Sequence, residues 1–419
     1  MTAQSSRPSP DRALLMRRDV LTGVASGLTA GVATLGVLAN WKTHSRIETP
    51  AKPIVQIRSE PPAAPLKVWP SLDALGQRMI DTRAAPGLSL SVMKAGVLLY
   101  ANAFGQARLT PRHAVTPQTG FRIASISKQF TAAAILLLAE QGKLHLDDPL
   151  ARFIPDFPRA PDMTLREMLS HTAGLDDYLS GRHADMLTAA QTRDYTQQGL
   201  LEALKAAAPI FRCPPGVKWV YSNTGFALLG IIVERLSGLP FGAFAQHHLF
   251  DPAGMTRTAL DPVVTADDDL CDGHRASRFG FGIVRPVSPS FAGGSGGLRS
   301  TSEDLCRWHA ALLAGKILKP DSLIAMLTPM KLKNDSYALD RDYPAYPGYG
   351  LGQRLGMIGG RPVFAHSGRI NGFTGQLLTF PLQQVTMAVL FNCDGANSGN
   401  FMPSLRALRN EALALGLAA

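Results

Sequence analysis

The chain has 419 residues, of which 46% are hydrophobic and 18% are charged, as in an ordinary globular protein with one large or two smaller domains. The net charge is +10, but the basic residues are scattered and form no nucleic-acid-binding motif, so we expect no nucleic-acid partner. The four cysteines and ten histidines lack the spacing of metal ligands, so we expect no metal site and no cofactor.

The first 45 residues have the features of a targeting segment. Arg17 and Arg18 directly precede an uncharged stretch, residues 20–41, which resembles a twin-arginine export signal. We therefore expect a periplasmic or extracytoplasmic location, with cleavage near Ala39. An uncleaved inner-membrane anchor is the alternative, because the stretch is long enough to span a bilayer. Residues 46–70 are rich in proline and are expected to form an extended linker.

The globular domain is expected to occupy residues 71–419. Its first part, Ser71–Arg83, has the pattern of a helix. Residues 87–107 then alternate polar and apolar side chains around Ala95 and Gly96, which predicts a β-hairpin.

A strongly apolar helix is predicted from Ile126 onward, ending at Gly142. Residues 146–314 then show helical patches separated by loops rich in proline and glycine, which suggests a mostly helical subdomain. Within it, Ser300 and Glu303 have the spacing of a capping box that opens the next helix.

Near the C-terminus, two strands are predicted on either side of residues 381–384, followed by an amphipathic helix from Met402. Strands thus occur at both ends of the domain and helices in its middle. This order predicts an α+β fold, in which both ends build one antiparallel sheet flanked by helices.

The stretch "RIASISKQF" contains two serines ahead of one lysine. Residues three apart share a helix face and adjacent residues do not, so Ser125 pairs with Lys128 while Ser127 points elsewhere. Ser125 is therefore the candidate nucleophile and Lys128 the base, provided that burial or nearby positive charge lowers the pKa of the lysine. A second S-x-x-K, Ser91 to Lys94, lies on the predicted hairpin, where residues three apart face opposite sides, and is interpreted as coincidence.

Two further triplets follow in order, Tyr221-Ser222-Asn223 and His366-Ser367-Gly368. With "SISK", and with the segments 169–175 and 296–308, they resemble the serine β-lactamase and penicillin-binding-protein superfamily over roughly residues 72–415. The most similar branch holds class C β-lactamases, DD-peptidases and esterases. The resemblance implies a β-lactamase/transpeptidase-like fold and an exported serine hydrolase that acts by acyl transfer through a covalent Ser125 acyl-enzyme.

The resemblance also implies roles for individual residues. If adjacent cations lower its pKa, Tyr221 would act as a general base in its phenolate form, in acylation or deacylation, and Asn223 would hydrogen-bond Lys128 and the substrate. The backbone N–H groups of Ser125 and Arg369 would form the oxyanion hole. His366, Ser367 and Gly368 would line the substrate strand, where the glycine permits a close approach.

The third motif departs from the β-lactamase pattern, because His366 stands where most β-lactamases have a lysine. Histidine is mostly neutral near pH 7, which favours an esterase or D-alanine carboxypeptidase-like activity over a true β-lactamase. The expected partner is a small-molecule or peptide substrate: an ester, a D-amino-acid peptide or a β-lactam. The sequence sets no expectation for the oligomeric state.

Two other functions fit parts of the sequence. Gly293 to Gly297 match the nucleophile elbow G-x-S-x-G around Ser295, with His366 downstream, but no strand precedes it directly. The scaffold could also bind the cell wall or a partner without catalysis. His171, in the segment 169–175, is interpreted as a structural residue.

Overall fold

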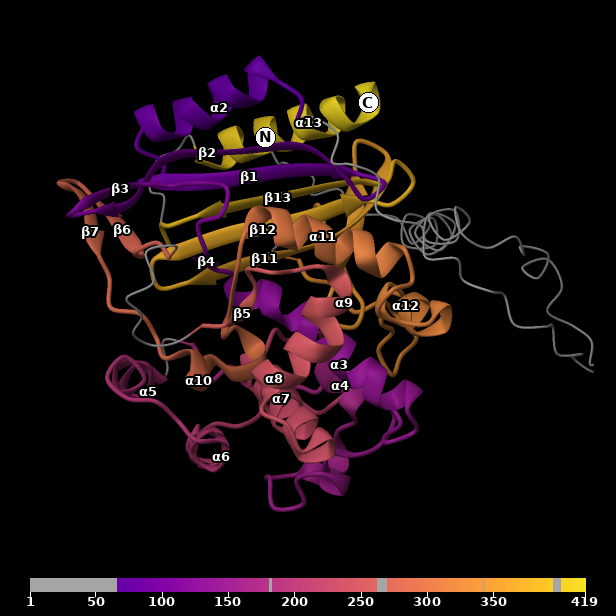
Figure 1. Ribbon diagram of the computed structural model, residues 1–419. Coiled ribbons are helices and arrows are strands. Elements are labelled where there is room, and N and C mark those ends of the chain that lie inside the picture. The colour runs from indigo at the N-terminus through magenta and orange to yellow at the C-terminus, as the bar shows by residue number, and fades with distance from the viewer. Residues whose placement is uncertain (1–65, 181–182, 262–269, 342, 395–400) are drawn as a thin grey trace, which may run out of the picture.

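An eight-stranded antiparallel sheet forms the centre of the molecule, in the order β3-β2-β1-β13-β12-β11-β10-β9 (Figure 1). The computed structural model describes residues 66–419 except 181–182, 262–269, 342 and 395–400. The expected targeting segment, residues 1–45, and most of the expected linker therefore lie outside the described residues. The strands of this sheet are β1 (Gly87–Lys94), β2 (Val97–Leu109), β3 (Arg112–Ala114), β9 (Gly348–Tyr349), β10 (Arg354–Ile358), β11 (Arg361–Ile370), β12 (Phe373–Phe380) and β13 (Val385–Phe391).

The sheet joins the two ends of the domain, as predicted. Strand β1 pairs with β13 along its length, from Leu88 opposite Phe391 to Lys94 opposite Val385. The β1–β2 turn has two residues with positive φ, Ala95 at 49° and Gly96 at 82°. Two positive φ values in a two-residue loop give a turn whose twist matches the flanking strands. The predicted α+β fold with an antiparallel sheet is confirmed.

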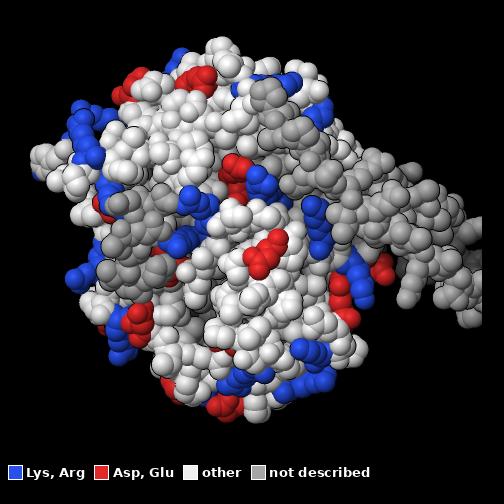
Figure 2. All heavy atoms as spheres, viewed as in Figure 1, with Lys and Arg blue, Asp and Glu red and all other residues white. Residues whose placement is uncertain are grey.

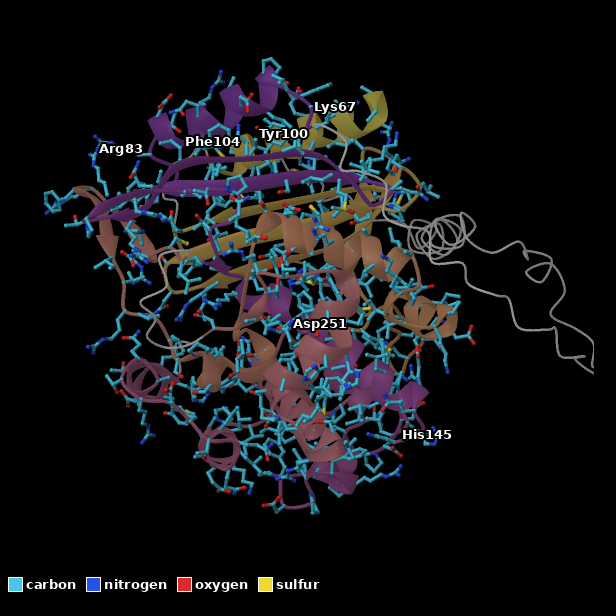
Figure 3. All side chains as sticks on the ribbon, viewed as in Figure 1. Lys67, Arg83, Tyr100, Phe104, His145 and Asp251 are labelled. Atoms are coloured by element: carbon cyan, nitrogen blue, oxygen red, sulfur yellow. The ribbon has the colours of Figure 1, made fainter. Side chains whose placement is uncertain are left out.

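Two helices, α2 (Pro70–Asp81) and α13 (Phe401–Ala418), cover one face of the sheet (Figure 1). Figure 3 labels Tyr100 and Phe104 of β2 beneath α2. The Tyr100 hydroxyl donates to Asp73 Oδ1 at 2.6 Å, and the ring of Phe104 lies against Gly76, where a Cβ atom would be only 2.4 Å away. The absence of a side chain at Gly76 thus lets α2 pack directly on β2.

Helix α11 (Ser302–Leu313) covers the opposite face and packs on β1 and β13. The sequence analysis assigns this segment to the mostly helical subdomain of residues 146–314. Its contacts place it instead in the layer next to the sheet. Its N-cap is Thr301, whose hydroxyl accepts from the Asp304 amide, so the predicted capping box at Ser300 and Glu303 is wrong and the helix is capped one residue later. The Ser302 hydroxyl is hydrogen-bonded to Ser91 at 2.8 Å, which confirms that Ser91 is a buried structural residue.

The rest of the middle region forms a helical layer below the sheet in Figure 1. Its central helix, α3 (Lys128–Glu140), is buried on nearly every side, which explains its continuous apolar sequence. The other helices are α4 (Leu165–Leu169), α5 (Ala184–Ala189), α6 (Gln197–Ala206), α7 (Asn223–Ser237), α8 (Phe241–Ala245), α9 (Asp251–Ala253), α10 (Pro289–Ala292) and α12 (Pro320–Met326). The short strands β4 (Phe121–Arg122), β8 (Leu298–Ser300) and β5 (Ala259–Leu260) form a small sheet, and β6 (His274–Ser277) and β7 (Gly280–Ile283) form a hairpin.

Charged side chains of both signs are interspersed over the face shown in Figure 2. Among the described residues, no group of three or more His, Cys, Asp or Glu is placed to hold a metal ion, and none of the four cysteines forms a disulfide bond. In the same part of the chain no single helix is long and apolar enough to cross a membrane; one bent pair, Asn223–Ser237 with Phe241–Ala253, meets the length and composition criteria together.

Candidate active site

Ser125 lies in a single 3-10 turn, η1 (Ala124–Ser127), immediately before α3. Ala124 has a φ of +48°, a conformation that is strained for a residue with a side chain and that often marks functional turns. Residues three apart eclipse one another in a 3-10 turn. The predicted pairing is present: Lys128 Nζ lies 3.1 Å from Ser125 Oγ, and the Tyr221 hydroxyl donates to the same oxygen at 2.6 Å.

Lys128 is fully buried, whereas Ser125 is partly exposed. Burial, opposed by the charge of Asp177 and assisted by that of Arg354, lowers the pKa of Lys128 to about 7. The Lys128 ammonium is expensive to bury because it loses its hydration. About half of the Lys128 side chains are therefore neutral near pH 7, as a general base requires.

Tyr221 is a neutral phenol in this site. Burial raises its pKa, and the hydrogen bond from its hydroxyl to Ser125 and the charge of Arg354 oppose this rise only in part. The phenolate implied by the family resemblance is therefore not the form that this environment favours. Tyr221 instead donates a proton to Ser125 Oγ, which leaves Lys128 as the group able to accept the serine proton.

Asn223, the first residue of α7, links Lys128 to an acid that the sequence did not single out. Its Oδ1 accepts from Lys128 Nζ at 2.6 Å, and its Nδ2 donates to both oxygens of Asp177 at 3.0 Å. Lys128 also donates to the backbone carbonyl of Ser295 at 2.8 Å. The predicted contact between Asn223 and Lys128 is present in the structure.

His366 on β11 is buried and has both ring nitrogens occupied. Because the Ser367 carbonyl can only accept, the contact of 2.7 Å makes Nδ1 the protonated nitrogen, and Nε2 accepts from the Tyr349 hydroxyl at 2.9 Å. Burial, with Arg354 and Lys128 nearby, lowers the pKa of His366 well below its usual value. The histidine is neutral and has no free nitrogen to bind a substrate carboxylate.

Gly368 brings β11 against the nucleophile turn. A Cβ atom at this position would lie 2.1 Å from the Ile123 carbonyl oxygen, so only glycine fits. Side chains alternate along a strand, so the exposed Arg369 side chain leaves β11 on the opposite face from Gly368. The close approach of β11 suits the two expected backbone donors, the N–H groups of Ser125 and Arg369. The direction of the Arg369 side chain does not suit a salt bridge to a substrate at Ser125.

Ser295 is not presented as a nucleophile. Its hydroxyl is completely buried and donates to the Ala292 carbonyl at 2.6 Å, and it lies in a 3-10 turn after a short helix. It therefore lacks the strand–turn–helix setting of an elbow. His171 is also structural: its Nδ1 accepts from the Ser222 amide at 3.2 Å, and its ring packs on Tyr221 with centroids 4.3 Å apart.

A buried ion pair between Arg354 and Asp340 lies beside this cluster. The Arg354 guanidinium stacks over Tyr343 at 3.9 Å from the ring centroid, and both members of the pair are at most 5% exposed. A buried cation near Lys128 favours the neutral amine. No motif in the sequence predicted this pair, because a lone arginine on a strand has no recognisable spacing to its acid.

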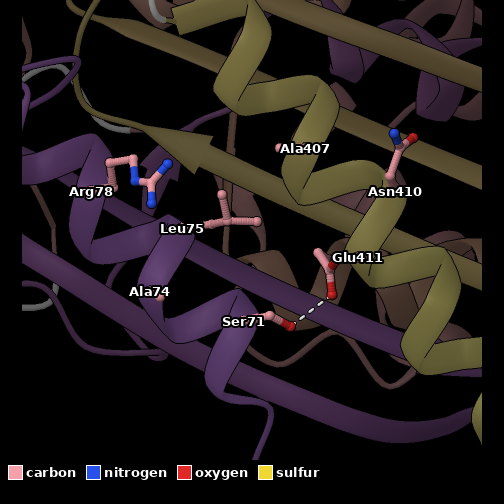
Figure 4. A pocket seen from close by; sticks show the side chains of 7 residues that line it. All are labelled: Ser71, Ala74, Leu75, Arg78, Ala407, Asn410 and Glu411. Atoms are coloured by element: carbon pink, nitrogen blue, oxygen red, sulfur yellow. Dashed lines mark hydrogen bonds between the residues drawn. The ribbon is translucent and has the colours of Figure 1, made fainter.

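A groove of about 420 Å³ lies elsewhere, between α2 and α13 (Figure 4). Its Ser71 hydroxyl donates to Glu411 at 2.7 Å, so these two polar side chains satisfy each other. The groove is on the opposite face of the sheet from α3, the helix that directly follows the Ser125 turn, so it is separate from the Ser125–Lys128–Tyr221 cluster.

Comparisons with known proteins agree with this geometry. The Beta-lactamase family model matches residues 72–411. Penicillin-binding protein 4* of Bacillus subtilis is 28% identical over 319 residues, covering 71% of this chain and 66% of that protein. A D-aminopeptidase of Brucella anthropi is 27% identical over 318 residues, covering 75% of this chain and 57% of that protein. This chain thus spans less than two thirds of the length of these relatives.

Solved structures show the same fold. The octameric penicillin-binding protein homologue from Pyrococcus abyssi superposes with a TM-score of 0.71 at 27% identity, covering 83% of this chain and 77% of that one. The motifs, the sheet built from both ends of the domain and the family match lead to one conclusion: this chain belongs to the beta-lactamase family.

Proposed function

We propose that this protein hydrolyses its substrate through a covalent acyl-enzyme on Ser125. One observation carries the proposal: Ser125 Oγ lies within hydrogen-bonding distance of both Lys128 Nζ and the Tyr221 hydroxyl. Neutral Lys128 takes the serine proton as Oγ attacks the substrate carbonyl carbon. The backbone N–H groups of Ser125 and Arg369 stabilise the oxyanion. The Tyr221 phenol passes a proton to the leaving group and is reprotonated by the Lys128 ammonium, which returns both side chains to their neutral forms. Water then hydrolyses the ester.

We propose D-amino-acid peptides or amides and simple esters as substrates, ahead of β-lactams. Neutral His366, with both nitrogens occupied, offers no charge for the carboxylate that a β-lactam carries. The similarity to a D-aminopeptidase and to penicillin-binding proteins supports an acyl donor of the D-amino-acid type.

Intact-mass spectrometry after treatment with a fluorophosphonate probe tests the nucleophile. Wild type and the matched control Ser127→Ala should gain one label, and Ser125→Ala should gain none. Label retained in Ser125→Ala would refute the assignment. Turnover of D- and L-alanine p-nitroanilide, p-nitrophenyl esters and nitrocefin then ranks the substrates. Absence of label and of all turnover would favour a binding protein without catalysis.

We also propose export through a twin-arginine signal, supported by Arg17, Arg18 and the uncharged stretch after them. Replacing both arginines with lysine should keep the protein in the cytoplasm. N-terminal sequencing of the exported protein distinguishes cleavage after Ala39 from an uncleaved anchor.

A further inference from the structure

Asp177 lies in the segment between α4 and α5. The residues on either side of it, Asp176 and Tyr178, are both hydrogen-bonded to the start of α7. The Asp176 carbonyl accepts from the hydroxyls of Ser222 at 2.9 Å and Thr224 at 2.7 Å. The Tyr178 amide donates to Thr224 Oγ1 at 3.2 Å. The Asp177 carboxylate is therefore held in a fixed position against the first residue of α7, Asn223.

This contact determines which way the Asn223 amide faces. Both carboxylate oxygens of Asp177 lie 3.0 Å from Asn223 Nδ2, and an ionised carboxylate can only accept hydrogen bonds. The NH₂ group of Asn223 must therefore face Asp177. Its carbonyl oxygen is left to face Lys128, 2.6 Å away.

The orientation of Asn223 in turn directs the lone pair of Lys128. A neutral amine has two N–H bonds and one lone pair. Two of the three neighbours of Lys128 Nζ are carbonyl oxygens, from Asn223 at 2.6 Å and Ser295 at 2.8 Å, and they take the two N–H bonds. The lone pair then points to the third neighbour, Ser125 Oγ, at 3.1 Å. If Asn223 were flipped, its NH₂ group would donate to the lone pair and occupy it.

We propose that Asp177 is a positioning residue for acylation, which acts through Asn223 to aim the lone pair of Lys128 at the Ser125 hydroxyl. The proposal rests on the acyl-enzyme function proposed above and adds the residue that orients its base. In this role Asp177 never contacts the substrate or the reacting atoms.

The simplest competing role is structural, because Asp177 also accepts from the Asn223 amide at 3.3 Å at the start of α7. A pH profile separates the two roles. The charged or titratable groups that face Lys128 come from several elements. Two of them are histidines, His171 and His366, and burial lowers the pKa of each well below its usual value. These groups are Asp177, Arg354, Tyr221, His171 and His366.

The test is the nearly isosteric variant Asp177→Asn, with Asp162→Asn as the matched control on the exposed surface. We expect kcat/KM for a p-nitrophenyl ester to fall about 10- to 100-fold at pH 8, as for other lost orienting partners. The acidic limb of the pH profile, where kcat/KM rises as Lys128 loses its proton, should move to lower pH in this variant. The reason is that the Asp177 charge, which favours the Lys128 ammonium, is gone. Asp177→Glu should recover part of the rate, and Asp162→Asn should match wild type.

The double variant Asp177→Asn/Asn223→Ala shows whether Asp177 acts through Asn223. We expect the double variant to have a kcat/KM less than twofold below that of Asn223→Ala alone. If the losses in kcat/KM of the two single variants instead multiply in the double variant, the proposal is overturned. A lower melting temperature with unchanged kcat/KM per folded molecule and an unmoved limb would show a purely structural role. Wild type that gains no label at Ser125 would refute the acyl-enzyme function itself. Labelled wild type with an equally active Asp177→Asn would refute the positioning role alone.

Discussion

Tyr349 donates its hydroxyl proton to Nε2 of His366 over 2.9 Å, deep inside the protein. This hydrogen bond, with the one from Nδ1 to the Ser367 carbonyl, requires a neutral ring. The residue that differs from the β-lactamase pattern is thus built into the scaffold as an uncharged link between two strands, β9 and β11.

His366→Lys, which restores the β-lactamase residue, should therefore not create β-lactamase activity. The new ammonium would be buried near Arg354 and Lys128, both of which lower the pKa of the present His366. We expect a loss of about 3 kcal/mol or more in the free energy of unfolding, measured by urea denaturation, as for an unpaired buried charge. A stable variant that hydrolyses nitrocefin faster than wild type would contradict this interpretation.

Lys128 should set the acidic limb of activity. Its pKa of about 7 means that kcat/KM rises with pH and reaches half of its maximum near pH 7, because only the neutral amine accepts a proton. Lys128→Ala should lower kcat/KM about 10²- to 10⁴-fold. Lys128→Arg should not rescue it, because a guanidinium stays protonated. A wild-type profile that is flat from pH 5 to 9 would argue against this base.

Tyr221→Phe should lower kcat/KM about 10²- to 10³-fold, as when one donor is lost from a reacting centre. The ring stays, so its packing on His171 and the melting temperature should change little. Because Tyr221 acts as a neutral phenol, the acidic limb should stay where Lys128 puts it. An acidic limb that vanishes in Tyr221→Phe would instead identify the tyrosine as the titrating base.

Gly368→Ala should separate β11 from the nucleophile turn, because its methyl group would lie 2.1 Å from the Ile123 carbonyl oxygen. We expect kcat/KM to fall about 100-fold, the effect of a displacement of about 1 Å at a reacting centre. Gly282→Ala is the control, since nothing lies within 4 Å of its Cβ position. Equal activities of the two variants would show that the close approach is unimportant.

His309 should make the fold sensitive to acid. Its Nε2 donates to Gln129 Oε1 at 2.7 Å, and burial lowers its pKa to about 3 from 6.5. The unfolded chain binds a proton below pH 6.5 and the folded chain does not, so stability is lost as pH falls from 6.5 towards 3. From pH 6.5 to 5, this group should remove about 2 kcal/mol.

Urea unfolding at both pH values measures that loss, and His309→Gln is the comparison. Glutamine can still donate to Gln129 but does not titrate, so the variant should lose about 2 kcal/mol less than wild type over this pH range. Equal losses in the two proteins would show that His309 already carries its proton when folded.

The sequence predicted the fold and the core of the site where local patterns decide the outcome. Ser125 and Lys128 meet because they are three positions apart at a helix start, and the hairpin turn follows from Ala95-Gly96. The N-cap of α11 is predicted one residue early, since Ser300 and Thr301 are both suitable caps and only the backbone selects one.

The parts of the site that depend on distant contacts were not predicted. Asp177 reaches Asn223 from 46 positions away, and no spacing rule links an acid to an amide across such a distance. The phenolate form of Tyr221 is implied by the family resemblance, which does not tell how deeply the ring is buried, and burial raises its pKa instead. Burial is a property of the assembled tertiary structure, not of any local pattern.

The pairing of β1 with β13 also has a consequence for biosynthesis. Lys94 leaves the ribosome roughly 290 residues before its partner Val385, which is about 15 to 60 s at ordinary rates of translation. Until then the first hairpin has no sheet to join, and β11 is not yet there to approach Ser125. The protein should therefore lack the proposed activity as a nascent chain and fold only after almost all of it has been synthesised.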